Sequence, residues 1–302
     1  MESFKAQQIV ERLSLGTIEE VLRVSGGYSG SDVFRVITDT HDLVVKFPSG
    51  SEPATSPDDR VYGADAHNFL PAYNLLKEQG LPVPRLYGHG VLDGEEYVVM
   101  DFIDGVSVRE HLAQGDVASQ EMLHAQVGTL FGKMHTITRS YFGSIDATAN
   151  DRFVDVFGQA FDVVLEKLKD FVDEELHTRI TTYVKAHLPR LNEPKQFVLS
   201  HLDGFQGMAK GGDIVVIDIE DHQFTDQRFV LAGQELSFEI EGKQTPELFW
   251  SAYKAETSIP ENYFETKDLF QLYYLVVWMH VPGIPDEGKK KVLNRIHSML
   301  EN

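Results

Sequence analysis

The chain has 302 residues, of which 42% are apolar and 25% charged, as in an ordinary globular protein large enough for two packed lobes. Its net charge of −20 argues against binding to nucleic acid or an anionic membrane and favours cationic partners. The absence of cysteine excludes disulfides, thiolate metal sites and cysteine nucleophiles. The first residues lack the apolar centre of a signal peptide and no apolar run is long enough to span a membrane, so we expect a cytoplasmic protein.

The first hundred residues are rich in β-type patterns. A short amphipathic helix is expected at 4–13, followed by stretches of β-branched residues that predict antiparallel strands. The predicted strands are 20–24, 33–38, 42–47, 85–91 and 95–102. Between the third and fourth, the Pro-, Ser- and Gly-rich segment 48–66 predicts a loop, and 67–79 predicts a helix closed by Gly80.

The rest of the chain is mostly helical in pattern. Apolar residues at helical spacing predict one helix around 123–134, two within 157–191, and three more at the C-terminal end. Those three are expected at 246–256, 266–281 and 285–300, and two short strands, 196–200 and 213–219, interrupt the helices. We therefore expect an N-terminal nucleotide-binding lobe over residues 1–102 and a helical lobe over residues 103–302, with the catalytic loop and the substrate site.

A glycine-rich segment and a strand lysine are the first motif with chemical content. Residues 25–31 read Ser-Gly-Gly-Tyr-Ser-Gly-Ser, and such glycines let backbone N–H groups approach phosphate oxygens, although an ordinary tight turn has the same composition. Lys46 follows in the apolar run Leu-Val-Val-Lys-Phe. A lysine that points into an interior needs an anionic partner, which nucleotide phosphates would supply; the alternative is a lysine that reaches solvent at a strand edge.

The second motif places two carboxylates at the ends of two apolar strands, which we expect to pair. His201-Leu-Asp203 follows the first strand and Asp218 follows the second. Such an arrangement suits phosphoryl transfer, in which one carboxylate orients and deprotonates the attacking hydroxyl and the other holds magnesium. Turn or capping aspartates are the alternative, but the order of glycine segment, lysine and two aspartates favours the functional reading.

Taken in this order, the motifs resemble the aminoglycoside phosphotransferase family, which includes choline, homoserine and fructosamine kinases. The resemblance spans most of the chain, and the segments that carry it are 25–36, 44–47, 81–84 (LPVP), 97–105 (YVVMDFIDG), 130–135 (LFGKMH), 201–203 and 215–221. It implies an α+β, bilobal protein-kinase-like fold with a β-rich N-lobe and a mainly helical C-lobe. It also implies Mg²⁺-dependent transfer of the γ-phosphate of ATP or GTP to a hydroxyl of a small molecule.

The resemblance also implies roles for individual residues. Asp203 would be the catalytic base, Asp218 the principal magnesium ligand, and His201 a structural support for the loop. Lys46 would contact the α- and β-phosphates, and backbone groups of the connector would hold the base. The residues implied for the nucleotide are Gly27, Ser29, Gly30, Lys46, Asp101 and Ile103.

Two departures from the family pattern bear on activity. Met208 stands where the family has an asparagine that binds a second magnesium ion, and we favour Gln206 as its replacement. The helix-borne glutamate that pairs with the strand lysine would fall near Asn68 or Phe69, and the nearest upstream acid is Asp65.

These departures leave open a catalytically impaired kinase-like protein that binds nucleotide or a small ligand without turnover. Because Lys46, Asp203 and Asp218 are all present, the active enzyme is favoured. A protein kinase is disfavoured, since no activation segment is recognisable.

The acceptor is expected between the catalytic loop and the late helices. Carboxylates and aromatic faces there suit a cationic amine such as an aminoglycoside or an amino alcohol, although helically spaced aromatic residues are more often core and such acids more often a solvated face. The candidates are Glu220, Asp221, Glu235, Glu239, Glu241, Trp250, Tyr253, Tyr273, Tyr274 and Trp278. The sequence leaves the acceptor's identity and the oligomeric state undefined.

Overall fold

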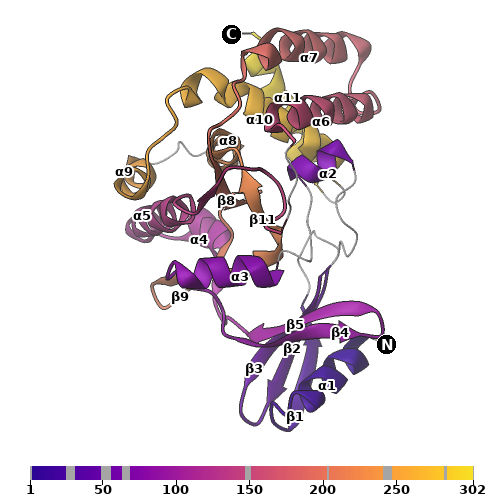
Figure 1. Cartoon of the computed structure of the whole chain (residues 1–302), viewed down its shortest axis with the longest axis vertical. Coiled ribbons are helices and arrows are strands. Elements are labelled where there is room, and N and C mark those ends of the chain that lie inside the picture. The colour runs from indigo at the N-terminus through magenta and orange to yellow at the C-terminus, as the bar shows by residue number, and fades with distance from the viewer. Residues whose placement is uncertain are drawn as a thin grey trace.

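The structure, a computed structural model, describes residues 2–24, 31–48, 56–62, 69–146, 151–202, 204–240, 247–281 and 284–301. An antiparallel sheet with one helix forms one end of the molecule, and most helices gather at the other end (Figure 1). The β-rich first part and the helical second part therefore agree with the sequence prediction.

The N-terminal sheet has five antiparallel strands in the order β1-β2-β3-β5-β4. They are β1 (Ile18–Arg23), β2 (Asp32–Thr38), β3 (Asp42–Phe47), β4 (Leu86–Leu92) and β5 (Glu95–Asp101). All five lie within two residues of their predicted bounds. The β4–β5 turn has positive φ at both Asp93 and Gly94, as the Asp-Gly sequence predicts for a two-residue hairpin.

One face of this sheet is covered by helix α1 (Glu2–Arg12), whose Ala6, Ile9 and Val10 are buried against it. On β3 the residues 43, 45 and 47 join this small apolar cluster. Because side chains alternate along a strand, Lys46 points to the opposite face, toward the rest of the molecule.

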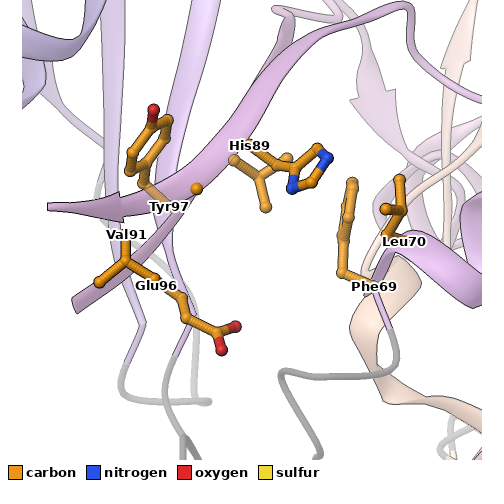
Figure 2. Close-up of a pocket in the computed structure, with 8 residues that line it drawn as sticks. Phe69, Leu70, His89, Val91, Glu96 and Tyr97 are labelled. Atoms are coloured by element: carbon orange, nitrogen blue, oxygen red, sulfur yellow. The ribbon is translucent and has the colours of Figure 1, made fainter. Parts of the chain in front are cut away.

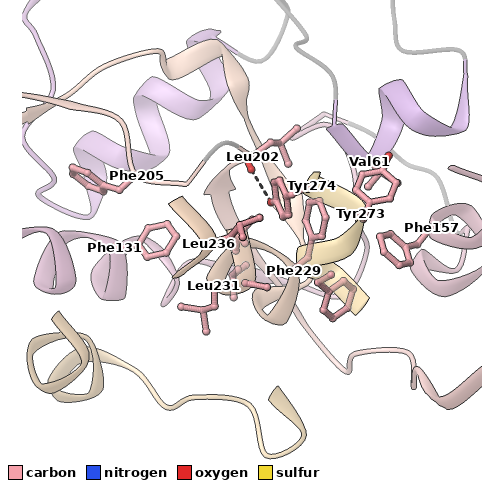
Figure 3. Packing of buried hydrophobic residues seen from close by; sticks show 14 of the residues in the cluster. Val61, Phe131, Phe157, Leu202, Phe205, Phe229, Leu231, Leu236, Tyr273 and Tyr274 are labelled. Carbon is pink, nitrogen blue, oxygen red and sulfur yellow. Dashed lines mark hydrogen bonds between the residues drawn. The ribbon is translucent and has the colours of Figure 1, made fainter. Parts of the chain in front are cut away.

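The second part of the chain holds a larger core rich in aromatic residues. Its helices are α4 (Val108–Gln114), α5 (Val117–Met134), α6 (Phe153–Leu168), α7 (Glu174–His187), α8 (Gln227–Ile240), α9 (Glu247–Glu256), α10 (Tyr263–His280) and α11 (Asp286–Leu300). Phe229 of α8 stacks on Tyr274 of α10 with ring centroids 4.5 Å apart, and Phe157 of α6 packs on Tyr273 (Figure 3). Helix α3 (Phe69–Glu78) also packs into this core, between the N-terminal sheet and the helices (Figure 1).

Two small antiparallel sheets lie within the helical part. In the first, β8 (Phe197–His201) is flanked by β7 (Thr138–Arg139) and β11 (His222–Thr225). In the second, β9 (Gly207–Lys210) is flanked by β6 (Val106–Ser107) and β10 (Asp213–Val216).

The prediction of an uninterrupted loop over 48–66 is wrong for its described part, where α2 (Pro57–Tyr62) forms a helix. Ser56 caps it by accepting a hydrogen bond from the Asp59 N–H, and proline is favourable in the first helical position. The helix packs on α6, where Val61 is buried and Asp58 accepts a hydrogen bond from Lys167 at 2.6 Å.

Helix α8 was not predicted from the sequence.

None of the helices in the described ranges is long and apolar enough to cross a bilayer.

Candidate active site

Lys46 lies at the centre of the interface between the sheet and the larger part of the molecule. Its strand β3 is the middle strand, and its side chain is 8% exposed. The ammonium group donates to Asp218 Oδ1 at 3.0 Å and also contacts Glu220 Oε1. Within the described residues, these two carboxylates are its ion-pair partners, so the expectation of a buried lysine with an anionic partner is confirmed.

The two partners differ strongly in exposure. The Glu220 side chain is 4% exposed, whereas that of Asp218 is 41% exposed. Burial acts to lower the pKa of Lys46, but the two carboxylates outweigh it and raise the pKa above its usual value. Burial likewise acts to raise the pKa of Asp218, and Lys46 reverses this, so the Asp218 pKa lies below its usual value. Asp218 is therefore ionised and partly accessible at neutral pH.

A tight turn brings both carboxylates to Lys46. Asp218 has left-handed backbone angles, φ 52° and ψ 50°, which are uncommon for a residue with a side chain. It is followed by one turn of 3₁₀ helix, η3 (Ile219–Asp221), and then by β11. The turn is anchored by buried Ile219, whose carbonyl accepts a hydrogen bond from His222 Nδ1 at 3.1 Å.

The expected pairing of the two strands that carry the aspartates is wrong. Strand β8, which leads to position 203, pairs with β7 and β11, while β10, which leads to Asp218, pairs with β9. The two motifs are still brought together, because His222, four residues after Asp218, lies opposite His201 in the β8–β11 ladder. His201 is buried and its Nε2 lies 3.5 Å from Asp221 Oδ2, which agrees with the structural role expected for it.

The loop after β8 is held from two helices. The Tyr274 hydroxyl of α10 donates to Leu202 O at 2.8 Å (Figure 3), and Gln234 Oε1 of α8 accepts from the Phe205 N–H at 2.8 Å. Both side chains are buried. The backbone on each side of position 203 is therefore fixed by a side chain from a different helix.

A buried chain of hydrogen bonds supports β8 from the other side. Gln227 Nε2 donates to the Tyr253 hydroxyl at 2.8 Å, and this hydroxyl lies 2.7 Å from His135 Nδ1. His135 Nε2 lies 3.2 Å from Ser200 Oγ, whose hydroxyl donates to the backbone carbonyl of the next residue. All of these hydrogen bonds can form at once when Nδ1 of His135 accepts and Nε2 donates, which is the neutral form of the imidazole. Burial lowers the pKa of His135 to about 3, consistent with this form.

Several residues with predicted roles lie outside the described residues: Gly27, Ser29, Gly30, Asp65, Asn68, Asp203 and Glu241. Their roles stay predictions. Phe69, the other position considered for the helix-borne glutamate, is buried at the start of α3.

Gln206 lies next to Asp218 across the β9–β10 hairpin, since the N–H of residue 217 donates to Gln206 O at 3.3 Å. Met208 pairs with Val215, three positions before Asp218, and is further along the hairpin. The backbone register thus brings Gln206 nearer to Asp218 than Met208, as the predicted replacement requires. Its role as a metal ligand stays a prediction.

The connector expected to hold the nucleotide base follows the end of β5. The Asp101 side chain accepts a hydrogen bond from the Tyr87 hydroxyl at 2.8 Å, and the next residue, Phe102, donates its N–H to Asp42 O at 2.9 Å. The Ile103 carbonyl accepts from the Gly105 N–H at 2.9 Å. These bonds fix the course of the connector after the sheet.

Sequence reasoning missed the main partner of Lys46. Glu220 was predicted to line the acceptor site, but it is buried and bound to Lys46. The signal available in the sequence was its position two residues after Asp218, directly behind the strand that delivers that aspartate.

Two other acidic residues proposed for the acceptor site, Glu235 and Glu239, also have protein partners. Glu235 accepts from the Tyr263 hydroxyl at 2.5 Å and from Lys267, and Glu239 pairs with Arg295 at 2.9 Å. Glu235 is largely buried, so the expectation that it forms part of a solvated face is wrong. Tyr253, Tyr273 and Tyr274 are core residues, as their helical spacing allowed.

A hollow of about 190 Å³ lies between α3 and strands β4 and β5 (Figure 2). Phe69 and Leu70 border it on the helix side, and His89, Val91 and Glu96 on the sheet side. It lies at the β4 edge of the sheet, and its lining includes Val98 of β5, which pairs with Lys46 of β3.

Comparison with solved structures shows the same fold over nearly the whole chain. A thermostable mutant of the aminoglycoside phosphotransferase APH(4)-Ia is 14% identical with a TM-score of 0.66, and the alignment covers 98% of both chains. Choline kinase LicA from Streptococcus pneumoniae is 15% identical with a TM-score of 0.61, and 99% of both chains is covered. APH(2")-IIa is 16% identical with a TM-score of 0.58, and 99% of this chain and 96% of that one are covered. These identities show the kinase-like fold alone.

The sequence comparison identifies the family. A search of curated protein sequences gave no match. The model of the phosphotransferase enzyme family (APH) matches residues 20–226, from the first strand of the sheet to the residue before α8. The match includes Lys46, the β8 strand and the turn that carries Asp218 and Glu220, so the chain belongs to the phosphotransferase enzyme family.

Proposed function

We propose that this protein transfers the γ-phosphate of ATP or GTP to a hydroxyl of a small molecule, with Mg²⁺ bound together with the nucleotide. The observation that carries the proposal is the buried ammonium of Lys46 at the centre of the sheet, paired with an accessible carboxylate at Asp218. A cation fixed at that depth is positioned for phosphate oxygens. The carboxylate beside it is positioned for the metal that accompanies them.

Relatives with this fold support the choice of nucleotide and acceptor class. Mutants of APH(4)-Ia were crystallised with ADP and hygromycin B and with AMP-PNP and hygromycin B, and APH(2")-IIa with ATP and streptomycin. The net charge of −20 favours a cationic acceptor here as well. The described carboxylates of α8 are already paired, so we do not assign acceptor recognition to Glu235 or Glu239.

The donor set near Lys46 fits magnesium that arrives with a nucleotide. No group of three or more acidic or histidine ligands occurs among the described residues, so a site formed by the protein alone is not expected there. Mg²⁺ typically uses one or two carboxylates together with substrate phosphates and water, and Asp218 offers such a carboxylate. Gln206 would add an amide oxygen. The metal would neutralise charge on the triphosphate during transfer.

The protein's own groups would carry out the remaining tasks. Lys46 would hold the α- and β-phosphates, and the connector near Asp101 and Ile103 would hold the base. Gly27, Ser29 and Gly30 would cover the phosphates with backbone N–H groups. Asp203 would orient the acceptor hydroxyl and take its proton as the new O–P bond forms, while the bond between the γ-phosphorus and the β–γ bridging oxygen breaks and releases ADP or GDP.

Calorimetric titration with ATP and with GTP, each with and without Mg²⁺, tests the nucleotide site. We expect magnesium-dependent binding to the wild-type protein, weakened at least about tenfold in Asp218→Asn, the size expected when one charged ligand is lost. Asp203→Ala should bind nucleotide nearly as well as the wild type and lose turnover of any acceptor found in a screen of cationic amino sugars and amino alcohols. Nucleotide binding without any product in that screen would favour the impaired kinase-like protein, and no binding would refute the proposal.

A further inference from the structure

The two carboxylates that contact Lys46 are not equivalent, and the difference suggests a division of tasks. Glu220 is enclosed and Asp218 is open, although both bind the same ammonium group. The exposed fraction is 4% for the Glu220 side chain and 41% for that of Asp218.

The backbone around Glu220 holds it in place from several sides. It is the middle residue of η3, which packs against α3. Before it, buried Ile219 anchors the turn, and after it the chain enters β11 at His222, which is fully buried and pairs with His201. Asp218, in contrast, sits at the exposed start of the turn.

An unpaired cation in this position would be unfavourable. Lys46 is almost fully enclosed, and a buried charge that loses its partner strongly destabilises the folded state. If Asp218 alone neutralised Lys46, then engaging Asp218 with a metal would leave the ammonium dependent on the nucleotide. Glu220 removes that dependence because it stays in contact with Lys46 when Asp218 turns to another partner.

We infer that Glu220 is the positioning residue for Lys46, holding the ammonium at the depth where it meets the nucleotide phosphates and leaving Asp218 available as a metal ligand. Among the described residues, it takes the task that the family resemblance assigns to a helix-borne acid near position 68. This acid comes from the turn that also carries Asp218. This inference rests on the proposed phosphotransferase function.

The inference predicts a loss of nucleotide affinity that a purely structural role would not produce. Glu220→Gln retains the shape of the side chain and removes its charge. Of the two described carboxylates only Asp218 then pairs with Lys46, and the ammonium group is held less firmly. We expect the dissociation constant of MgATP to rise about tenfold, the usual effect of losing one charge-assisted hydrogen bond. The KM for ATP should rise with it, while kcat at saturating ATP changes less.

A second readout needs no nucleotide. The rate at which an amine-reactive reagent labels Lys46, followed by mass spectrometry across pH 7 to 10, reports how readily this lysine loses its proton. In Glu220→Gln the labelling profile should shift toward lower pH, because burial continues to disfavour the charged amine and one carboxylate is gone.

Two variants keep the experiment decisive. Asp58→Asn is the matched control, since Asp58 is also a buried carboxylate in an ion pair with a lysine, the half-exposed Lys167 at 2.6 Å, but between α2 and α6. It should leave both the MgATP affinity and the Lys46 labelling unchanged. If Glu220→Gln does not fold, Glu220→Asp keeps the charge and shortens the side chain by one methylene, and it should still raise the dissociation constant.

The outcomes separate the inference from the proposed function. If the wild-type protein binds no MgATP, the proposed function fails. If the wild type binds and folded Glu220 variants bind equally well, the positioning role is refuted, whether or not the labelling changes. Weaker binding together with shifted labelling, both absent in Asp58→Asn, supports it.

Discussion

Helices α5 and α9 approach each other so closely that glycines of α5, Gly128 and Gly132, are needed at the contact. A Cβ added to Gly128 of α5 would lie 2.4 Å from Phe249 O and 3.1 Å from the Phe249 C and Cα atoms. All three are backbone atoms of α9, so none can rotate away. A Cβ on Gly158 of α6 would meet only the side-chain tip of Leu188, at 3.2 Å. We use Gly128 and Gly158 as a matched pair, because both lie within helices.

The expected stabilities follow from two opposing effects. Alanine in place of a helical glycine normally stabilises by about 1 kcal/mol. Forcing a methyl group into a packed contact costs about 1–3 kcal/mol, and we take the upper end for Gly128 because backbone must move to restore an ordinary separation. Gly128→Ala should therefore lower the free energy of unfolding by about 2 kcal/mol. Gly158→Ala should raise it by about 0.5–1 kcal/mol, since the Leu188 tip can yield.

Urea denaturation of the two purified variants and the wild type, with the slope held in common, measures these free energies. The reasoning would be refuted if Gly128→Ala were as stable as the wild type, or if both alanines changed stability in the same direction. Because α9 carries Tyr253, which bonds to His135 behind β8, a displaced α9 should also reduce turnover in Gly128→Ala. Gly158→Ala should leave turnover unchanged.

Two further predictions concern the supports of the loop after β8. Burial lowers the pKa of His135 from 6.5 to about 3, so protonation favours the unfolded chain and stability is lost as pH falls below 6.5. From pH 7.5 to 5.5 this residue should remove about 1.4 kcal/mol of unfolding free energy, and urea titrations of His135→Gln should show a correspondingly smaller drop; an equal drop would contradict the neutral, buried state. Tyr274→Phe removes the hydroxyl bound to Leu202 O and should lower kcat about tenfold with little change in the KM for ATP. Its control is Tyr273→Phe, because the buried Tyr273 hydroxyl has no hydrogen-bond partner in the described parts of the chain, and equal kcat in the two variants would argue against the loop support.

Much of the N-terminal sheet could be predicted because its signals are local. Strand β3 alternates between residues that face α1 and residues that face the rest of the molecule, and the Asp93-Gly94 turn needs no partner from elsewhere. The inward direction of Lys46 follows from the same alternation. These features depend on a few neighbouring residues, so one sequence is enough to recognise them.

Helix α8 was not predicted, because part of what stabilises its first turn lies far away in the sequence. Asp226 caps its start by accepting from the Arg228 N–H at 2.9 Å, a pattern that the sequence displays. The Arg228 side chain returns to the Asp226 carboxylate and also donates to Asn192 O at 2.7 Å. The pair itself is local in the sequence, but the carbonyl that satisfies the rest of the Arg228 guanidinium lies 36 positions away, so the sequence does not show that the two charges can be buried.

The candidate site was predictable in its order of motifs but not in its pairing. The register of β8 with β11, rather than with β10, depends on the turn at Asp218, whose left-handed backbone has no residue signature such as glycine. That turn sends Glu220 toward Lys46 instead of the acceptor side. The sequence prediction paired the two strands directly, and it therefore assigned Glu220 to the acceptor site and not to Lys46.

The small cluster between α1 and the outer face of the sheet is separate from the large core that includes α3 and Val98. Regions with separate cores can open as separate units, at different free energies. The outer cluster has far fewer members, so the sheet and α1 are the natural first unit to open, while α3 stays folded with the helices. Amide hydrogen exchange would then be faster in the strands of the sheet and in α1 than in α3 and the later helices. Helix α3 would exchange with the helical part although it precedes β4 and β5 in the chain, so the unit of cooperative folding would not follow the order of the chain.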